Sequence, residues 1–259
     1  RDQPRSRGLG DVYKRQIELV STFLGAHAVP PEYKGRSKAF LDFLLKEVMP
    51  VVKKENLAEF CDIFCEEGVF SVDESRQYLK KAREMGFKLK IHADEIVSLG
   101  GSELAGELKA TSADHLLHAS DAGIKAMAEN GVVSTLLPTT AFCLREPFAR
   151  AREMIDAGCA VALATDFNPG SGFTFSVPLM LGLAVIYMHM TAEEAITALT
   201  LNGAAAVGRA DRIGSIEVGK QADLTILQYP SYKFLPYHTG VNIVEKVIKK
   251  GELVHTASV

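Results

Sequence analysis

Three residues able to do chemistry stand where apolar runs of the sequence end. His92 follows FKLKI, His115 closes SADH, and Asp166 lies in ATDFNPGS. One such histidine alone is more often a hydrogen-bonded structural residue, so only the three together indicate a metal site. Imidazole and carboxylate suit zinc or a similar divalent ion with an open position for water. Such an ion lowers the pKa of its water to about 7, and a nearby carboxylate can pass the proton on, so the three predict a hydrolytic metal centre.

Apolar, β-branched runs recur along the chain with helical segments between them. The predicted strands fall at 17–24, 59–65, 87–91, 112–118, 132–137 and 159–165. This alternation favours parallel strands with right-handed crossovers, and units of roughly 25 to 30 residues are typical of a (β/α)8 barrel, in which strand ends converge on one face. A doubly wound open sheet also fits the spacing. However, the chain contains no GxGxxG or GxxxxGKS loop, which counts against a nucleotide-binding version.

Capping residues predict three helices, which span 71–86, 120–131 and 191–208. The first and third open with a Ser or Thr followed three residues later by Glu, the spacing of a capping box. Glycine stands where the first two would end, as a left-handed stop requires. The apolar stripe of the third helix is ordinary core packing.

The composition and the predicted structure of the chain change near its two ends. Residues 1–16 are basic, have no apolar centre of the kind that a secretion signal needs, and are expected to be a disordered or foreign tail. Residues 17–208 carry the barrel pattern. Residues 209–259 have short strands and tight turns, with Lys250 and Gly251 as one turn and Gly219 in another. We therefore expect a tail, a catalytic barrel domain and the C-terminal part of a small β-sandwich.

Composition places the chain among ordinary globular proteins. It has 259 residues, is 47% hydrophobic and 24% charged, and carries a net charge of -3. The longest Lys-rich stretches are short and lie beside acids, and no apolar run reaches the roughly 18 residues of a membrane span, so we expect neither nucleic acid nor a membrane as partner. The four cysteines, at 61, 65, 143 and 159, form no CxxC pair. Buried free thiols in the cytoplasm are the expectation.

Several motifs together indicate a family. KIHADE, SADH, ATDFNPGS and the ending GSIEVGKQADLTIL resemble the amidohydrolase superfamily, and STFLGAHAVPPEY, LPTTAF and PYHTGVN are similar to its imidazolonepropionase family. The resemblance extends from about Ile17 to His255. It implies a TIM (β/α)8-type barrel, one divalent ion (Zn²⁺ or Fe) and a homodimer. The implied reaction is hydrolysis of the ring amide of 4-imidazolone-5-propanoate to N-formimidoyl-L-glutamate, a step of histidine degradation.

The resemblance also assigns roles to individual residues. His92 and Asp166 match metal ligands, and Asp166 also matches a catalytic proton carrier. His115 matches the catalytic histidine beside the scissile carbonyl, where it stabilises the developing oxyanion. Glu95 matches the carboxylate that meets the imidazolone ring and counts as catalytic too. The residues matched to substrate contacts are His27, Glu95, Asn168, Gly170 and Ser171.

Other polar residues near these motifs have simpler interpretations. Asp94 is expected to be a hydrated residue leaving the barrel. Pro169 and Gly170 could serve as turn residues without a ligand. The remaining histidines are expected to be surface or structural residues, and they are His118, His189, His238 and His255.

The chain departs from the family pattern at one point. Family members have a His-x-His pair on the first barrel strand, and an arginine and a tyrosine from the N-terminal half that hold the substrate carboxylate. None of these is expected in this chain, which contains no His-x-His. Its first recognisable segment corresponds to about the third strand. We therefore expect an N-terminally truncated barrel with open sheet edges, weak metal affinity, low stability and little activity.

Two other functions stay open at this level. Ring deaminases of the cytosine or guanine type also place a glutamate three residues after a strand-end histidine, although GAHAVPPEY and FNPGS favour the imidazolonepropionase family. A non-catalytic remnant would explain the missing pair. The retention of the other site residues argues against it.

Overall fold

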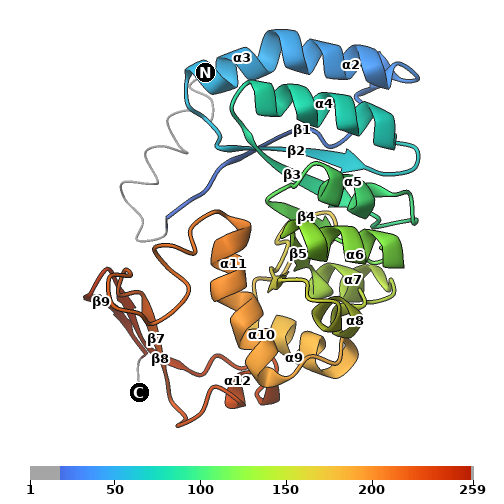
Figure 1. The fold of residues 1–259 in the computed structure, drawn as a ribbon. Helices are drawn as coiled ribbons and strands as arrows, with labels where there is room; N and C mark the ends of the chain where they lie inside the picture. Colours follow the sequence, from blue (N-terminus) through green and yellow to red (C-terminus); the bar gives the residue numbers. More distant parts are fainter. Residues whose placement is uncertain (1–17, 258–259) are drawn as a thin grey trace.

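The computed structural model describes residues 18–257 and contains a six-stranded parallel sheet (Figure 1). The strands pair in chain order, and they are β1 Thr22–Ala26, β2 Phe60–Cys65, β3 Lys88–Ala93, β4 Ser112–His115, β5 Val133–Leu136 and β6 Val161–Leu163. The six predicted strands are confirmed, although the first lies slightly later than expected. The predicted tail at residues 1–16 lies outside the described residues.

Helices alternate with these strands, and α4 to α8 follow one another from the top of the view downward in Figure 1. Their bounds are η1 Pro31–Tyr33, α2 Ser37–Phe43, η2 Leu44–Val48, α3 Met49–Lys54, α4 Val72–Glu84, α5 Gly101–Glu107, α6 Asp121–Asn130, α7 Pro138–Leu144, α8 Ala151–Asp156, α9 Val177–Tyr187, α10 Ala192–Leu199, α11 Leu201–Ala206 and α12 Phe234–Tyr237. Apolar residues of the helices and strands form one large buried cluster between the two layers. Within the described residues β1 and β6 are the sheet edges. The architecture is an incomplete TIM-type barrel.

The predicted caps are present. Ser71 accepts from the backbone N–H of Glu74, whose carboxylate accepts from the N–H of Ser71, so α4 begins with a complete capping box. Thr191 begins α10 in the same way. Gly131 ends α6 in the left-handed region with φ of 66°. These local signals depend on a few adjacent residues, which is why the sequence alone predicts them.

The single helix predicted over 191–208 is wrong, because the structure divides it into α10 and α11. The break falls at Thr200, whose backbone (φ -104°, ψ -83°) leaves the helical region. Past the break, the Asn202 side chain donates to the carbonyl of Val161 at 2.8 Å, on edge strand β6. The chain turns so that α11 can pack against β5 and β6. Tertiary packing therefore overrides a continuous helical pattern.

Two glycines allow α5 and α6 to pack closely. A Cβ atom at Gly106 would lie 2.7 Å from the backbone carbonyl carbon of Ala126, and one at Gly123 would overlap the hydroxyl of Ser102. Both glycines are buried within helices. The contact fixes α5, which directly follows the loop that carries Glu95.

The C-terminal residues form a separate antiparallel sheet of three strands, β7 Leu224–Leu227, β8 Val244–Lys249 and β9 Glu252–Thr256. Lys250 (φ 54°) and Gly251 (φ 83°) form the predicted turn between β8 and β9. Glu18 contacts the amines of Lys249 and Lys250, so the segment before β1 is tied to this sheet. The expected domain boundary near 209 stays a prediction.

The cysteine prediction needs one correction. Cys61, Cys65 and Cys159 are buried free thiols, but Cys143 is exposed near the end of α7. Its neighbours on the same surface, Phe142 and Leu144, are exposed too, so that turn of the helix faces out of the core. Among residues 18–257, helices that combine the length and the apolarity of a membrane span are absent.

Candidate active site

Three of the predicted histidines meet at the carboxyl ends of the strands. His92 lies in β3, and His115 ends β4, where it pairs in register with Ala93. The ring centroids of His92 and His115 are 5.2 Å apart. His27, just past β1, meets His92 edge-on at 5.4 Å. Parallel pairing brings these residues together from distant parts of the sequence.

The His92 ring adjoins a carboxylate that the sequence reasoning missed. Asp62 Oδ1 lies 3.1 Å from His92 Nδ1 and also accepts the backbone N–H of His92 at 3.2 Å. Asp62 is buried in β2, and Asp114 lies opposite His92 in β4. One ligand atom from each of Asp62, His92 and Asp114 lies within 4.8 Å of the others. An acid in the middle of the apolar run FCDIFC was the signal that could have revealed Asp62.

These acids decide the charge of His92 in the absence of a metal. Burial by itself would lower the pKa of His92, but the carboxylate of Asp62, aided by Asp114 and Glu95, raises it to about 9. The negative potential that stabilises a protonated imidazolium would also stabilise a metal cation bound beside a neutral His92. A histidine with neighbouring carboxylates is the donor set that zinc and iron accept, so the residues fit a divalent ion.

Glu95 and His115 form a second pair. Glu95 Oε1 lies 3.4 Å from His115 Nδ1. Burial, with the charge of Asp166 and against that of His92, raises the pKa of Glu95 to about 7. Burial and the charge of His92 lower the pKa of His115 to about 3. His115 is therefore neutral at physiological pH, whereas Glu95 can gain or lose a proton there.

Asp166 is fixed by the neighbouring strand unit. It follows β6 with φ of 49°, and Thr140 at the start of α7 donates its hydroxyl to Asp166 Oδ2 at 2.7 Å. The carboxylate acts electrostatically on both Glu95 and His27. Asp166 therefore belongs to the same charged group as the histidines. Thr140 was missed by the sequence reasoning, although LPTTAF was among its motifs.

The prediction that Asp94 is a hydrated residue is wrong. Its side chain is 0% exposed and accepts backbone N–H groups from Leu99, Gly100, Gly101 and Ser102, at 2.9 to 3.1 Å. These donors open α5, whose first N–H groups have no partners within the helix. Burial and four donors explain why a carboxylate stays here instead of reaching water. Asp94 is therefore an anchor for the loop that carries Glu95.

The predicted substrate loop is held by its own side chains. Asn168 Oδ1 accepts the N–H groups of Gly170 and Ser171 at 2.8 and 2.9 Å, and Asn168 Nδ2 donates to Ser171 Oγ. This is the turn that the sequence predicted for Gly170, and it leaves the substrate role a prediction. The ring of Phe167 adjoins those of Phe173 and Phe175, and all three are exposed on the same loop.

One of the histidines expected to be structural has clear ring partners. His238 stacks on Tyr229 with a centroid distance of 4.7 Å and contacts Phe234. These aromatic residues lie near α12, outside the cluster of catalytic candidates. The contacts agree with a structural role for His238.

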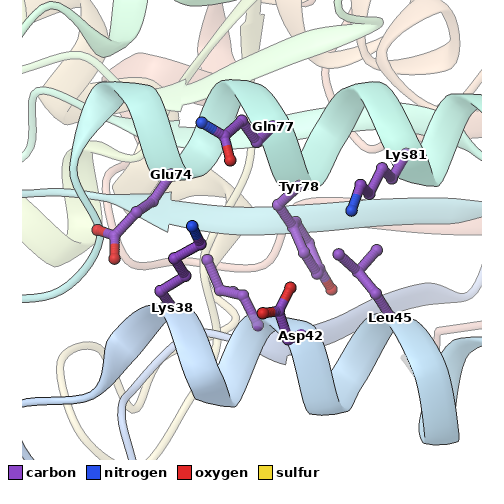
Figure 2. Close-up of a pocket in the computed structure, with 8 residues that line it drawn as sticks. Lys38, Asp42, Leu45, Glu74, Gln77, Tyr78 and Lys81 are labelled. Carbon is purple, nitrogen blue, oxygen red and sulfur yellow. The ribbon is translucent and has the colours of Figure 1, made fainter.

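A groove on the outer helical layer lies away from these residues. Figure 2 shows it between α2 and α4, with Lys38 and Asp42 on one side and Glu74 and Lys81 on the other. Tyr78 fills its floor and is almost fully buried. None of the candidate catalytic residues lines it. The groove is a packing feature between two covering helices.

The parallel sheet and the histidine–carboxylate cluster at its strand ends define a protein with an incomplete (β/α) barrel and a candidate metal site. The profile of the Amidohydrolase family matches residues 58–254. The chain belongs to the amidohydrolase family. It is 69% identical over 242 residues to a Clostridium tetani protein named imidazolonepropionase, and 64% identical over 237 residues to one from Parabacteroides distasonis. The matches cover 93% and 92% of this chain but 58% and 57% of those proteins, so the chain spans little more than half their length.

Solved structures share the fold. A zinc-bound adenosine deaminase from Xanthomonas campestris matches with a TM-score of 0.70 and 21% identity, over 94% of this chain and 62% of that chain. A Xaa-Pro dipeptidase with bound methionine matches with a TM-score of 0.72 and 17% identity, over 96% and 72%. At these identities the likeness concerns the fold alone.

Proposed function

We propose that the protein hydrolyses the ring amide of 4-imidazolone-5-propanoate to N-formimidoyl-L-glutamate. The observation that carries this proposal is the 69% identity, over 93% of the chain, to the imidazolonepropionase of Clostridium tetani. The cluster of His92, His115 and Glu95 supports it with suitable chemistry. A location in the cytoplasm and a homodimer are part of the proposal and are supported by the family resemblance.

In this proposal His92 and Asp166 hold one divalent ion, zinc or iron. Asp62 Oδ1 lies 3.1 Å from His92 Nδ1 and accepts the backbone N–H of His92, so it stands where a carboxylate would orient a metal-bound histidine and leave Nε2 for the ion. When bound, the ion would polarise the substrate carbonyl and lower the pKa of water. Asp114 adds a further negative charge beside His92.

In the proposed reaction, the remaining side chains transfer protons and stabilise the developing charge. Asp166 accepts a proton from the attacking water and delivers it to the ring nitrogen that leaves. Neutral His115 donates an N–H to the carbonyl oxygen as negative charge develops there. When Glu95 is protonated it can donate to His115 Nδ1, which keeps the proton of that ring on Nε2, where the donation is needed.

Substrate contacts come from three loops. Glu95 meets the imidazolone ring from the loop after β3, and His27 contacts substrate from the loop after β1. Asn168, Gly170 and Ser171 cradle the substrate from the loop after β6, where the bonds within the turn already fix their backbone. A fixed loop loses little conformational entropy on binding.

The proposal is tested with the protein produced as its gene encodes it and loaded with zinc. Loss of imidazolone absorbance together with appearance of N-formimidoyl-L-glutamate is the expected result, and Glu95→Gln should reduce the rate. Ammonia release from guanine or cytosine is measured in parallel. A folded, zinc-bound protein that releases ammonia from either base and leaves the imidazolone intact would overturn the proposal. Light scattering tests the homodimer.

A further inference from the structure

We infer that Glu66 is a positioning residue, which holds the backbone of Glu95 so that the Glu95 carboxylate faces His115. Glu66 directly follows β2, the strand next to β3 in the sheet. The effect of Glu66 on the reaction rests on the proposed role of Glu95. The contacts between Glu66 and the loop are observed directly among the described residues.

The Glu66 carboxylate is surrounded by backbone donors. Oε2 accepts the N–H groups of Glu95 and Ile96, each at 2.9 Å, and Oε1 accepts those of Val97 at 3.3 Å and of Glu67 at 2.9 Å. Glu66 is 1% exposed. A buried carboxylate is stable only when its charge is met by such donors. The four N–H groups supply that compensation.

The loop from 94 to 100, here called the Glu95 loop, depends on two buried acids. Asp94 binds the backbone from Leu99 onward and fixes the end that leads into α5. Glu66 binds the other end, which includes the N–H of Glu95 itself. The side chain of Asp94 therefore secures the helix start, and Glu66 secures the catalytic residue.

The position of Glu95 matters because its partner is fixed. His115 is buried in β4, and Glu95 Oε1 lies 3.4 Å from its Nδ1. Displacing a catalytic group by about 1 Å can cost roughly 100-fold in rate. Losing the bonds from Glu66 would free the backbone of Glu95 to move by such an amount, while the strands that carry His92 and His115 stay in place.

The chemistry of the side chain explains why an acid is needed. Each carboxylate oxygen accepts two of the four N–H groups. Glutamine has one acceptor oxygen and an NH2 group, which would face backbone donors with a donor of its own. Glu66→Gln therefore keeps the size of the side chain but breaks about half of the contacts. Glu66→Asp keeps both oxygens on a shorter stem.

The test compares Glu66→Gln and Glu66→Asp with Glu67→Gln, the same change at the exposed neighbouring residue. Hydrogen exchange at the amides of 95–97 should accelerate at least about tenfold in Glu66→Gln, with the strand amides unchanged. kcat for imidazolone hydrolysis should fall about 10-fold to 100-fold with KM within about threefold. Glu66→Asp should recover part of kcat, and Glu67→Gln should match the parent protein in both measurements.

Two outcomes would overturn the inference. One is a folded Glu66→Gln protein with the exchange and kcat of the parent. The other is rapid hydrogen exchange at amides 95–97 in the parent protein itself. This measurement needs no variant, so it tests the inference even if Glu66→Gln does not fold. If the parent protein does not hydrolyse the imidazolone, the proposed function fails, and the exchange measurements still decide whether Glu66 holds the loop.

Discussion

Glu95 Oε1 and His115 Nδ1 lie 3.4 Å apart, and burial shifts the pKa values of the two groups in opposite directions. Glu95 gains affinity for a proton and His115 loses it. A neutral imidazole beside a carboxyl group that titrates near neutrality can present either a donor or an acceptor to substrate. In the proposed mechanism, the proton on Glu95 therefore decides which nitrogen of His115 carries a proton.

The raised pKa of Glu95 predicts a pH dependence of folding stability. The folded state binds the proton up to a pKa of about 7, whereas the unfolded carboxyl group has a pKa near 4.5. Stability from this group is therefore complete below pH 4.5 and is lost as the pH rises toward 7. In metal-free protein, Glu95→Gln should lose less unfolding free energy between pH 4.5 and 7.5 than the parent does. Urea titrations across this range measure it, and equal slopes would contradict the assignment.

Removing the charge of Asp62 should weaken metal binding. Asp62→Asn keeps the shape but loses the carboxylate that faces His92 Nδ1. Zinc affinity should fall about 10-fold to 100-fold, the usual cost of changing a residue that orients a metal ligand. Competition with a chromophoric chelator measures it. Asp42→Asn, in the groove between α2 and α4, is the matched control and should bind zinc as the parent does.

Thr140 should matter through its hydroxyl. Thr140→Val has nearly the same shape but cannot donate to Asp166 Oδ2. Because a hydrogen bond to a charged group is worth about 1.5 to 3 kcal/mol, kcat should fall roughly tenfold or more. Thr140→Ser keeps the donor and should restore most of kcat. Steady-state kinetics of both variants decide the point, and equal rates for valine and serine would show that the hydroxyl is irrelevant.

The close contact between α5 and α6 predicts that alanine substitutions at two glycines will change the stability of the protein differently. Gly106→Ala gains about 1 kcal/mol of helix preference but forces a Cβ against the backbone of Ala126, and such overpacking typically costs about 1 to 3 kcal/mol. The variant should be destabilised. Gly203→Ala in α11 has its nearest neighbour at 3.4 Å and serves as the control, with stability equal to or above that of the parent. Urea unfolding compares them, and a stabilised Gly106→Ala would refute the steric argument.

The sequence by itself predicted the strands, the starts of three helices and the family. Six apolar runs predicted the six strands, and the capping residues at 71, 120 and 191 predicted where α4, α6 and α10 begin. These signals depend on residues close together in the chain. The motifs around His92, His115 and Asp166 predicted the family in the same way, and the match over residues 58–254 confirmed it.

Only the tertiary structure decided which side chains support these residues. Asp62 meets His92, Glu66 meets the backbone of Glu95, and Thr140 meets Asp166 across separations of 26 to 30 residues. The burial of Asp94 and the break at Thr200 were also decided by packing. A hydrogen bond between neighbouring strands depends on their register and on the path of each loop, and neither can be read from the composition of a single segment.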